Sequence, residues 1–243
     1  MSGHSKWSTI KHKKGAADAK RAQYFSKLIR EITAAVREGG NDAETNPRLR
    51  LAIQNAKGAN MPKENIERAI HKGGAADTAA FTNLTYEGTF VQGAAIIIEC
   101  TTDNLNRTVG NVRAIFNKQG ATLGKNGSVT FLFDRKGTCI IPQEVVQDEE
   151  ALTLSLIEAG LEDIVHDPEG ACYYLTSTVA NFGALQKELE KLEIPVEQAS
   201  LRYIPHTFVE LDQEAFDKMM KLVDLLEEKE DVQQVYHNVN LKA

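Results

Sequence analysis

The sequence predicts an α+β protein of 243 residues, with a basic helical bundle at the N-terminus and two α/β modules after it, one inserted into the other. Three observations support this prediction. Apolar residues recur at helical spacing through the first 80 residues. Strand-like and helix-like segments then alternate to the end of the chain. The balance of charge changes sign near residue 80.

The first predicted helix extends from Gly15 to Glu38. Gly39-Gly40 supplies the left-handed backbone that ends many helices. One side of the helix carries an apolar stripe made of Ala22, Phe25, Leu28, Ile29, Ile32, Ala35 and Val36. We expect this stripe to pack inward and the cations of the opposite side to face solvent, namely Lys20, Lys27, Arg30 and Arg37.

Two shorter helices are expected to complete a three-helix bundle. Asn46-Pro47 starts the second, with the asparagine as cap and the proline in the first turn. The third follows Asn60-Met61-Pro62 and ends at Gly73-Gly74. Short links and one apolar face per helix are typical of a bundle. The link between the two short helices has no distinctive signature, so it is only weak support for a DNA-binding helix-turn-helix.

A first α/β set follows the small-residue stretch 75–80. Its strands are indicated by alternation and by β-branched residues, and its helices by capping residues. The expected elements are strands at Leu84–Gly88 and Ala94–Cys100, a helix capped by Thr102-Asp103 and ending near Lys118, a strand at Val129–Phe133 after an Asn126-Gly127 hairpin turn, an acidic helix opened by Asp212, and a strand at Val232–Val239.

A second set lies inside the first. Its expected elements are strands at Thr138–Ile141, Leu161–Val165, Cys172–Thr176 and Val196–Ile204, with helices at Asp148–Ala159 and Val179–Leu192. The order βαββαβ is that of the split βαβ, or ferredoxin-like, arrangement. The outer elements supply a similar set if the inner one is an insertion. We therefore expect three domains: 1–80, 81–133 together with 207–243, and the inserted 134–206.

Positive charge is concentrated at the N-terminus of an acidic chain. The whole sequence has a net charge of -6, but residues 1–80 hold 15 lysines and arginines against 8 acids, a net of +7, which leaves -13 for the rest. Such asymmetry favours a nucleic-acid-facing module joined to acidic modules, whereas an uneven solvated surface is the alternative. The candidate nucleic-acid-binding residues are Lys6, Trp7, Lys11, His12, Lys13, Lys14, Lys20, Arg21, Lys27, Arg30, Arg48 and Arg50.

These candidates promise affinity more than specificity, because lysine contributes point charge with little base readout. Trp7 either stacks on an exposed base or pins the N-terminal segment to another domain. Duplex DNA and ribosomal RNA predict the same basic patch, so the residues do not distinguish between these two partners.

Catalytic and metal sites find little support in the sequence. Gly120–Asn126 is too short for a phosphate-binding loop and precedes a strand, so we interpret it as a turn. The six histidines have no zinc spacing, and no serine lies in a nucleophile elbow. Scattered acids leave a metal-dependent nuclease as a third, weak hypothesis. We expect no cofactor, and we expect Cys100, Cys139 and Cys172 to be reduced, buried thiols of a cytoplasmic protein.

Membrane association is not expected, because the longest apolar run, Ala94–Ile98, is too short to span a bilayer. The absence of an apolar stretch after the basic start also disfavours a secretory signal. A mitochondrial transit peptide is a weaker alternative, since residues 1–17 hold no acid but few bulky apolar residues.

One polar cluster, Thr101–Thr108, lies at an expected strand-to-helix junction. Helix N-termini attract anions, and Arg107 or Arg113 would assist such binding. Helix capping by Thr102 or Asp103 explains much of the same motif, and we favour it.

Several short motifs together resemble one family along the whole chain. They are Gly3-His4-Ser5-Lys6-Trp7, Asn46-Pro47-Arg48-Leu49-Arg50, Asn60-Met61-Pro62-Lys63, Tyr86-Glu87-Gly88, Thr102-Asp103-Asn104 with Asn106-Arg107-Thr108, and Gly127-Ser128-Val129. The pattern resembles the YebC/PmpR family of probable transcriptional regulators, whose mitochondrial relatives activate translation of a cytochrome oxidase subunit. Leu105 stands where many members have an arginine.

The resemblance implies a cytoplasmic, non-enzymatic protein with a helical domain and two α/β domains, one inserted in the other. It implies either a DNA-binding transcriptional regulator or, as the alternative, a ribosome-associated translation factor that relieves stalling. In a DNA-binding regulator the acidic α/β domains would contact a protein partner or shape a groove. The family's basic patch matches this sequence at Lys6, Lys11, Lys13, Lys14, Lys20, Arg21, Lys27 and Arg30.

Overall fold

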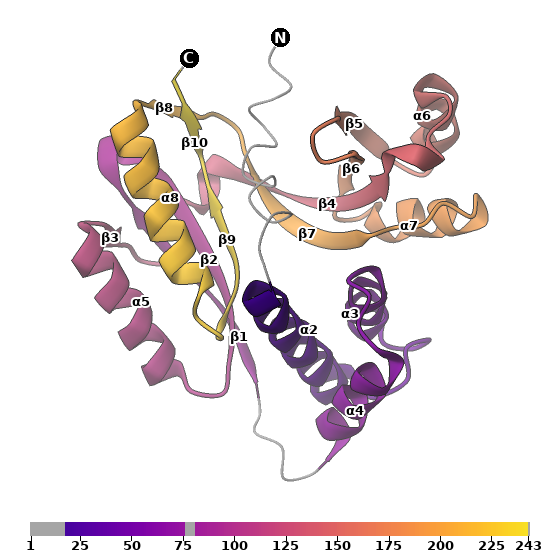
Figure 1. The fold of residues 1–243 in the computed structure, drawn as a ribbon, viewed down its shortest axis with the longest axis horizontal. Coiled ribbons are helices and arrows are strands. Elements are labelled where there is room, and N and C mark those ends of the chain that lie inside the picture. The colour runs from indigo at the N-terminus through magenta and orange to yellow at the C-terminus, as the bar shows by residue number, and fades with distance from the viewer. Residues whose placement is uncertain (1–17, 76–80, 243) are drawn as a thin grey trace.

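Three helices form the N-terminal part of the protein, whose computed structural model describes residues 18–75 and 81–242. They are α2 (Asp18–Gly39), α3 (Pro47–Gly58) and α4 (Lys63–Gly74), and they pack together below the rest of the molecule in Figure 1. The predicted apolar stripe of α2 packs inward, with Leu28, Ile32 and Val36 buried against α3 and α4. The three predicted helices are therefore confirmed, apart from residues 15–17, which lie outside the described residues.

Asn46 fixes the turn between α2 and α3. Its side chain is buried and accepts a hydrogen bond from the Leu49 amide at 3.0 Å, which is the predicted N-cap. The same side chain donates to the carbonyl oxygens of Ala35 and Gly40, each at 2.8 Å. One asparagine thus joins the end of α2 to the start of α3.

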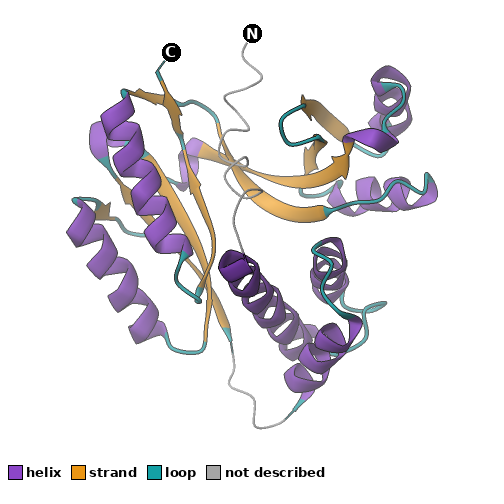
Figure 2. Cartoon of the chain, viewed as in Figure 1, coloured by secondary structure: helices purple, strands orange, loops and turns teal. Residues whose placement is uncertain are grey.

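The first sheet has the strand order β3-β1-β2-β9, with antiparallel neighbours. Helices α5 and α8 cover one face of it, where Ile96, Ile98, Phe116 and Leu222 are in the buried core (Figures 1 and 2). The elements are β1 (Thr82–Thr89), β2 (Ala95–Thr102), α5 (Leu105–Gln119), β3 (Thr122–Leu123), α8 (Gln213–Glu227) and β9 (Val232–His237).

The outer α/β set is not of the βαββαβ type, although its first elements follow the expected order of two strands and then a helix. Two antiparallel strands, β1 and β2, precede α5, because a tight connection with Gln92 and Gly93 at positive φ joins them. The last expected strand is also interrupted at Asn238, whose side chain accepts from the Ala95 amide at 2.7 Å. The chain then continues as β10 (Val239–Leu241), which pairs in parallel with an unpredicted strand, β8 (Val209–Leu211).

The strand predicted at Val129–Phe133 is wrong. Thr130–Leu132 forms a short 3-10 helix, and the next strand begins only at Phe133. The cause is the buried carboxylate of Glu87, which accepts from the amides of Gly127 at 2.6 Å, Val129 at 2.8 Å and Thr130 at 3.0 Å. Amides held by a carboxylate cannot take part in a strand ladder.

The second sheet has the strand order β5-β6-β4-β7 with antiparallel neighbours, and its elements follow the predicted chain order βαββαβ. Helices α6 and α7 pack on one face, where Cys139 and Leu175 of the sheet share a buried core with Leu185 of α7. The elements are β4 (Phe133–Pro142), α6 (Glu149–Ile157), β5 (Leu161–Asp167), β6 (Cys172–Thr178), α7 (Phe182–Lys191) and β7 (Gln198–Pro205). The three cysteines are free and buried, as predicted.

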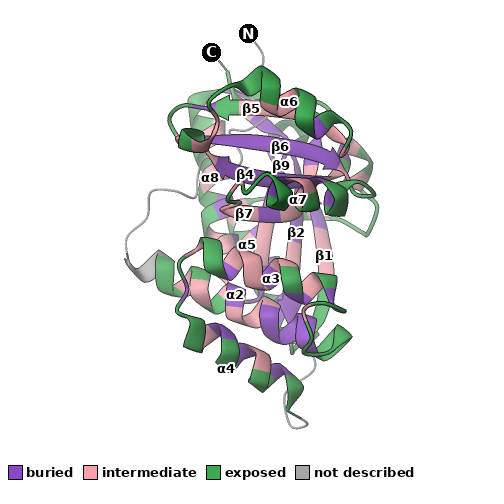
Figure 3. Ribbon diagram, turned by 90° about the vertical axis from the view of Figure 1, so that its right-hand side faces the viewer, coloured by how far each residue is buried: buried purple, intermediate pink, exposed green. Residues whose placement is uncertain are grey.

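The paired strands β4 and β7 connect the two sheets. They pair from Phe133 and Pro205 to Ile140 and Gln198, and in Figure 1 this ribbon runs from the first sheet to the second. Figure 3 shows that these strands lie in the buried interior while helices α4 and α6 present exposed outer faces. The three parts of the chain therefore surround a common central region.

Two glycines provide a test of the first core. A Cβ on Gly88 would lie 2.6 Å from the Thr122 carbonyl oxygen and would overlap the buried Phe116 ring. We expect Gly88→Ala to lower the free energy of unfolding by about 1–3 kcal/mol, as in overpacked cores. Urea unfolding followed by circular dichroism measures this.

Gly110→Ala is the matched control, because its Cβ would meet nothing within 4 Å on helix α5. We expect it to raise the free energy of unfolding by about 0.5–1 kcal/mol, the usual gain of alanine over glycine in a helix. Equal stabilities of the two variants would contradict the tight contact at Gly88.

Candidate nucleic-acid interface and interdomain cleft

The structure describes half of the predicted nucleic-acid-binding residues. Lys6, Trp7, Lys11, His12, Lys13 and Lys14 lie outside the described residues, and Lys20 falls in the first turn of α2. The others are Arg21, Lys27 and Arg30 on α2, and Arg48 and Arg50 on α3.

Lys27 and Arg30 do not face solvent, contrary to the expectation for the polar side of α2. The Lys27 ammonium donates to the Glu227 carbonyl oxygen at 2.7 Å. The Arg30 guanidinium pairs with Asp231 and donates to the Thr101 carbonyl oxygen at 3.3 Å. The helix lies against the end of β2 and the α8–β9 turn, so these cations hold the two parts of the molecule together.

Arg48 is also engaged within the protein. It donates to both oxygens of the Glu31 carboxylate, at 2.8 and 3.0 Å, and pairs with Glu38. A further bond at 3.1 Å reaches Asn83 on β1. Burial opposes its charge, but the two carboxylates outweigh this and raise the pKa of Arg48.

Arg21 and Arg50 are the exposed members of the described set. The Arg21 guanidinium lies 5.5 Å from the centre of the Phe25 ring. Arg50 donates to the carbonyl oxygens of Ala43 at 3.0 Å and Glu44 at 2.7 Å, and it forms no ion pair with a carboxylate of the described residues. These two side chains are available to an external phosphate.

The carboxylate of Asp231 is the centre of the contact between α2 and the first sheet. It lies in the α8–β9 turn, is 5% exposed, and accepts from Thr108 at 2.8 Å and from Arg107 at 2.9 Å, in addition to its pair with Arg30. Burial would raise the pKa of this carboxyl, but these hydrogen bonds and charges outweigh it and lower the pKa.

The polar cluster Thr101–Thr108 therefore has an internal partner. Its helix cap is Asn104, which accepts from the Arg107 amide at 3.0 Å, and not Thr102 or Asp103 as predicted. The Thr102 hydroxyl is instead buried and bonded to that of Thr108 at 2.8 Å. Arg107 is neutralised by Asp231 and by Asp103 at 2.6 Å, so an acid of the chain occupies the place expected for an anion.

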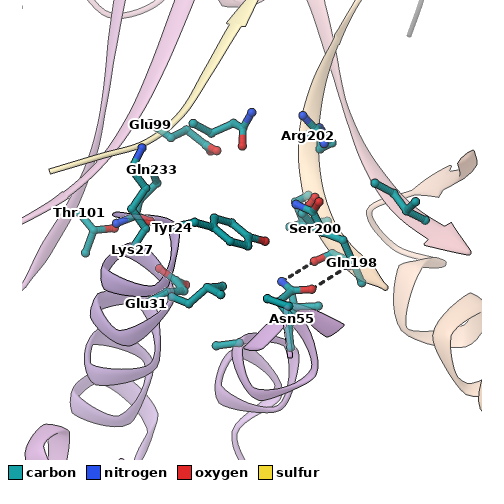
Figure 4. Close-up of a pocket in the computed structure, with 18 of the residues that line it drawn as sticks. Tyr24, Lys27, Glu31, Asn55, Glu99, Thr101, Gln198, Ser200, Arg202 and Gln233 are labelled. Carbon is teal, nitrogen blue, oxygen red and sulfur yellow. Dashed lines mark hydrogen bonds between the residues drawn. The ribbon is translucent and has the colours of Figure 1, made fainter. Parts of the chain in front are cut away.

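A cleft of 1230 Å³ lies between the three parts of the molecule (Figure 4). Helix α3 closes it on one side, because the Asn55 amide exchanges two hydrogen bonds of 2.8 Å with the backbone of Ala199 on β7. The labelled lining residues are Tyr24, Lys27 and Glu31 of α2, Asn55 of α3, Glu99 and Thr101 of β2, Gln233 of β9, and Gln198, Ser200 and Arg202 of β7.

The far wall of the cleft is a network of charge and aromatic rings. Arg135 pairs with Glu99, and its guanidinium lies 4.3 Å from the Tyr203 ring centre. The Tyr236 hydroxyl donates to the other Glu99 oxygen at 2.8 Å. Burial raises the pKa of Tyr236 well above its ordinary value, and the charge of Glu99 adds to this. Both oxygens of Glu99 therefore have partners, and Glu99 forms no ion pair with Arg202.

Sequence reasoning missed the cleft-lining residues, including Tyr24, Arg202 and Gln233. They come from segments about 30 to 210 positions apart, and no motif surrounds them. Only the alternation of β7, which directs Ser200 and Arg202 to one face, carried a signal. In the described part of the chain, no group of three potential metal-binding side chains occurs, and no helix is long and apolar enough to cross a membrane.

Comparisons with known proteins cover almost the entire chain. Residues 5–76 match a family model described as the TACO1/YebC protein N-terminal domain, and residues 81–239 match the TACO1/YebC second and third domain. A probable transcriptional regulatory protein of Amoebophilus asiaticus is 64% identical over 98% of both chains, and one of Persephonella marina is 50% identical over 99% of this chain and 96% of that protein.

A solved structure shares the fold. The crystal structure of the conserved hypothetical protein Aq1575 from Aquifex aeolicus superposes with a TM-score of 0.87 at 44% identity, over 98% of this chain and 97% of that one. The arrangement of a helical region followed by mixed α/β domains with antiparallel sheets is therefore shared with that protein.

The Asp231 contact predicts a defined loss of stability. Asp231→Asn removes the buried charge to which Arg30, Arg107 and Thr108 donate, and we expect the free energy of unfolding to fall by about 2–4 kcal/mol. Because the pKa of Asp231 is lowered in the folded state, this difference is complete above about pH 5 and shrinks as the pH falls below about 4. Urea unfolding of both proteins at several pH values measures it.

Asp103→Asn is the control, since Asp103 is exposed and pairs with Arg107 alone. Its cost should stay below about 1 kcal/mol, the usual range of surface ion pairs. A stability difference at Asp231 that is small, or that does not change with pH, would contradict the role given to this carboxylate.

Proposed function

Because the chain belongs to the TACO1/YebC family, we propose that it is a cytoplasmic transcriptional regulator that binds duplex DNA through its N-terminal basic segment. The relatives named above are probable transcriptional regulatory proteins, which supports regulation by binding in place of catalysis. The observation that carries the proposal is the division of charge, +7 in residues 1–80 against -13 in the remainder.

The set of residues that we propose to contact DNA is smaller than the set predicted from the sequence. Lys27, Arg30 and Arg48 already hold internal partners, and releasing them would weaken the contacts between the helices and the first sheet. The phosphate contacts are assigned to the remaining basic residues, which are Lys6, Lys11, Lys13, Lys14, Lys20, Arg21 and Arg50. Trp7 and His12 lie within the same segment and are proposed to contact bases or sugars.

The acidic α/β parts are proposed to contact a protein. Their net charge of -13 repels the phosphate backbone. Leu154 and Ile157 on α6 are 65% and 52% exposed, and exposed apolar side chains of this kind favour protein contacts over nucleic acid. We place the nucleic acid at the helical end of the molecule and the protein partner at the inserted end.

Charge reversal tests the basic segment. For a protein that neutralises about six phosphates, the logarithm of the affinity for duplex DNA falls against the logarithm of salt concentration with a slope near -5. Reversing Lys11, Lys13, Lys14 and Lys20 to glutamate removes about four of these contacts. We expect binding to be lost at physiological salt and the slope to approach -2, measured by fluorescence anisotropy.

The matched control reverses Lys118, Lys125, Lys187 and Lys221, four exposed lysines of the acidic parts, and so changes the net charge equally. Equal affinities of the two variants would refute the basic segment as the DNA-binding surface. Ribosomes are titrated in parallel, since nanomolar binding to ribosomes with weak, sequence-blind binding to DNA would assign the protein to translation.

A further inference from the structure

Arg202 is a buried cation without a partner. Its side chain projects from β7 into the cleft, and the residue is 4% exposed. Its guanidinium makes no hydrogen bond and no ion pair with the described part of the chain, and it lies 5.9 Å from the centre of the Tyr236 ring. A buried charge normally requires a hydrogen-bonded counter-ion, because desolvation of a free cation costs several kcal/mol.

Two of the acids that line the cleft with Arg202 are already engaged. Glu99 binds Arg135 and the Tyr236 hydroxyl, and Glu31 binds Arg48. Neither can rotate toward β7 without breaking an existing ion pair. The five N–H groups of the guanidinium therefore lack an acceptor within the described protein, and an anion from outside supplies what is missing.

Gln233 provides a second, independent donor on the opposite wall. Its Nε2 atom is buried and has no hydrogen-bond partner in the described structure. The residue comes from β9, while Arg202 comes from β7, so the two donors face the cleft from different sheets (Figure 4). A single ligand that satisfies both spans the cleft and carries an anion at one end and an acceptor at the other.

Tyr24 lies between these two walls in Figure 4. It is exposed, whereas the other aromatic rings of the cleft, those of Tyr174, Phe182 and Tyr236, are buried. Burial of its hydroxyl raises the pKa of Tyr24, and the charge of Arg202 opposes this, as expected if the hydroxyl points toward β7. The exposed ring offers a face on which a planar group stacks.

Charge and volume set the size of the ligand. A cleft of 1230 Å³ exceeds the roughly 300–1,000 Å³ of most small-molecule sites, so it has room for a nucleotide. Asp224 and Glu228 lie at the α8 end of the cleft and are exposed, so they repel a long phosphate chain. These observations favour a ligand with its phosphate confined to the β7 wall.

We propose that the cleft binds a phosphate-bearing nucleotide, with the Arg202 guanidinium on the phosphate, the base stacked on Tyr24 and a base acceptor on Gln233. The choice of a nucleotide over another organic phosphate rests on the proposed nucleic-acid function, whereas the need for an anion rests on Arg202 alone. A free mononucleotide and the 5′-terminal nucleotide of a strand present the same chemistry.

Calorimetric titration of the full-length protein with adenosine 5′-monophosphate tests this site. We expect one binding site, affinity at least tenfold weaker for adenosine, and a further loss of at least tenfold in Arg202→Gln, the range for hydrogen bonds to charged groups. Arg113→Gln, which removes an exposed charge on α5 away from the cleft, should bind as the wild type does. Absence of binding, or equal binding by adenosine, overturns the proposal.

Stability separates a ligand-binding arginine from a structural one. Removal of an unpaired buried cation should leave the melting temperature of ligand-free Arg202→Gln equal to or above that of the wild type. A clear fall would mean that Arg202 serves packing, and would overturn the proposal. If Arg202→Gln does not fold, nucleotide affinity is measured in Gln233→Leu instead. Unchanged affinity in Gln233→Leu overturns the assignment of Gln233.

Competing probes identify the ligand class. A 5′-phosphorylated hexadeoxyadenylate that binds more tightly than the mononucleotide supports a strand end, and the reverse supports a free nucleotide. Inorganic phosphate or hexaglutamate binding as tightly as either would overturn the nucleotide. The four-lysine variant should retain mononucleotide binding and Arg202→Gln should retain duplex binding, so that failure of one site is distinguishable from failure of the other.

Discussion

The buried carboxylate of Asp231 is the contact on which the arrangement of the molecule depends. It receives hydrogen bonds from Arg30 on α2 and from Arg107 and Thr108 on α5, so one acid joins the helical bundle to the first sheet. A carboxylate at this depth requires such donors, because burial without them would favour its protonated form. The orientation of α2 follows from this pairing, and with it the wall of the cleft that carries Tyr24.

The wall of the cleft opposite α2 is held in place by hydrogen bonds between uncharged groups. The Asn55 side chain forms hydrogen bonds with the N–H and the carbonyl oxygen of Ala199, as a neighbouring strand would. These bonds hold α3 against β7 of the second sheet. The backbone of Glu197 would overlap a Cβ at Gly58, which shows how closely α3 approaches β7. The bundle is thus attached to both sheets, and the cleft has walls from all three. The shape of the cleft depends on the contacts of Asp231 and Asn55, which lie at its borders. A ligand that touches several walls would in turn stabilise the contact between the bundle and the two sheets.

The sequence was sufficient for features set by local physics and insufficient for those set by distant partners. The three helices, their glycine ends and the Asn46 cap followed from periodicity and capping, which act within a few residues. The strand expected at Val129–Phe133 failed because Glu87, some 40 positions earlier, binds its amides. The exposure expected for Arg30 failed because Asp231 lies 201 positions away. For Arg202 the alternation of β7 was the only signal, because its importance lies in having no hydrogen bond or ion pair within the described part of the chain.

Several residues of the motifs that resemble the family make internal contacts. Asn46 caps α3, Glu87 binds the turn at Gly127, and Arg107 binds Asp231. Such residues define the relative placement of the helices and sheets and leave little polar surface for a partner. The two binding sites that we propose, the basic N-terminal segment and the cleft at Arg202, therefore do not depend on these motif residues. The basic segment carries its charges close together in the sequence. The cleft at Arg202 is formed only when three parts of the chain come together.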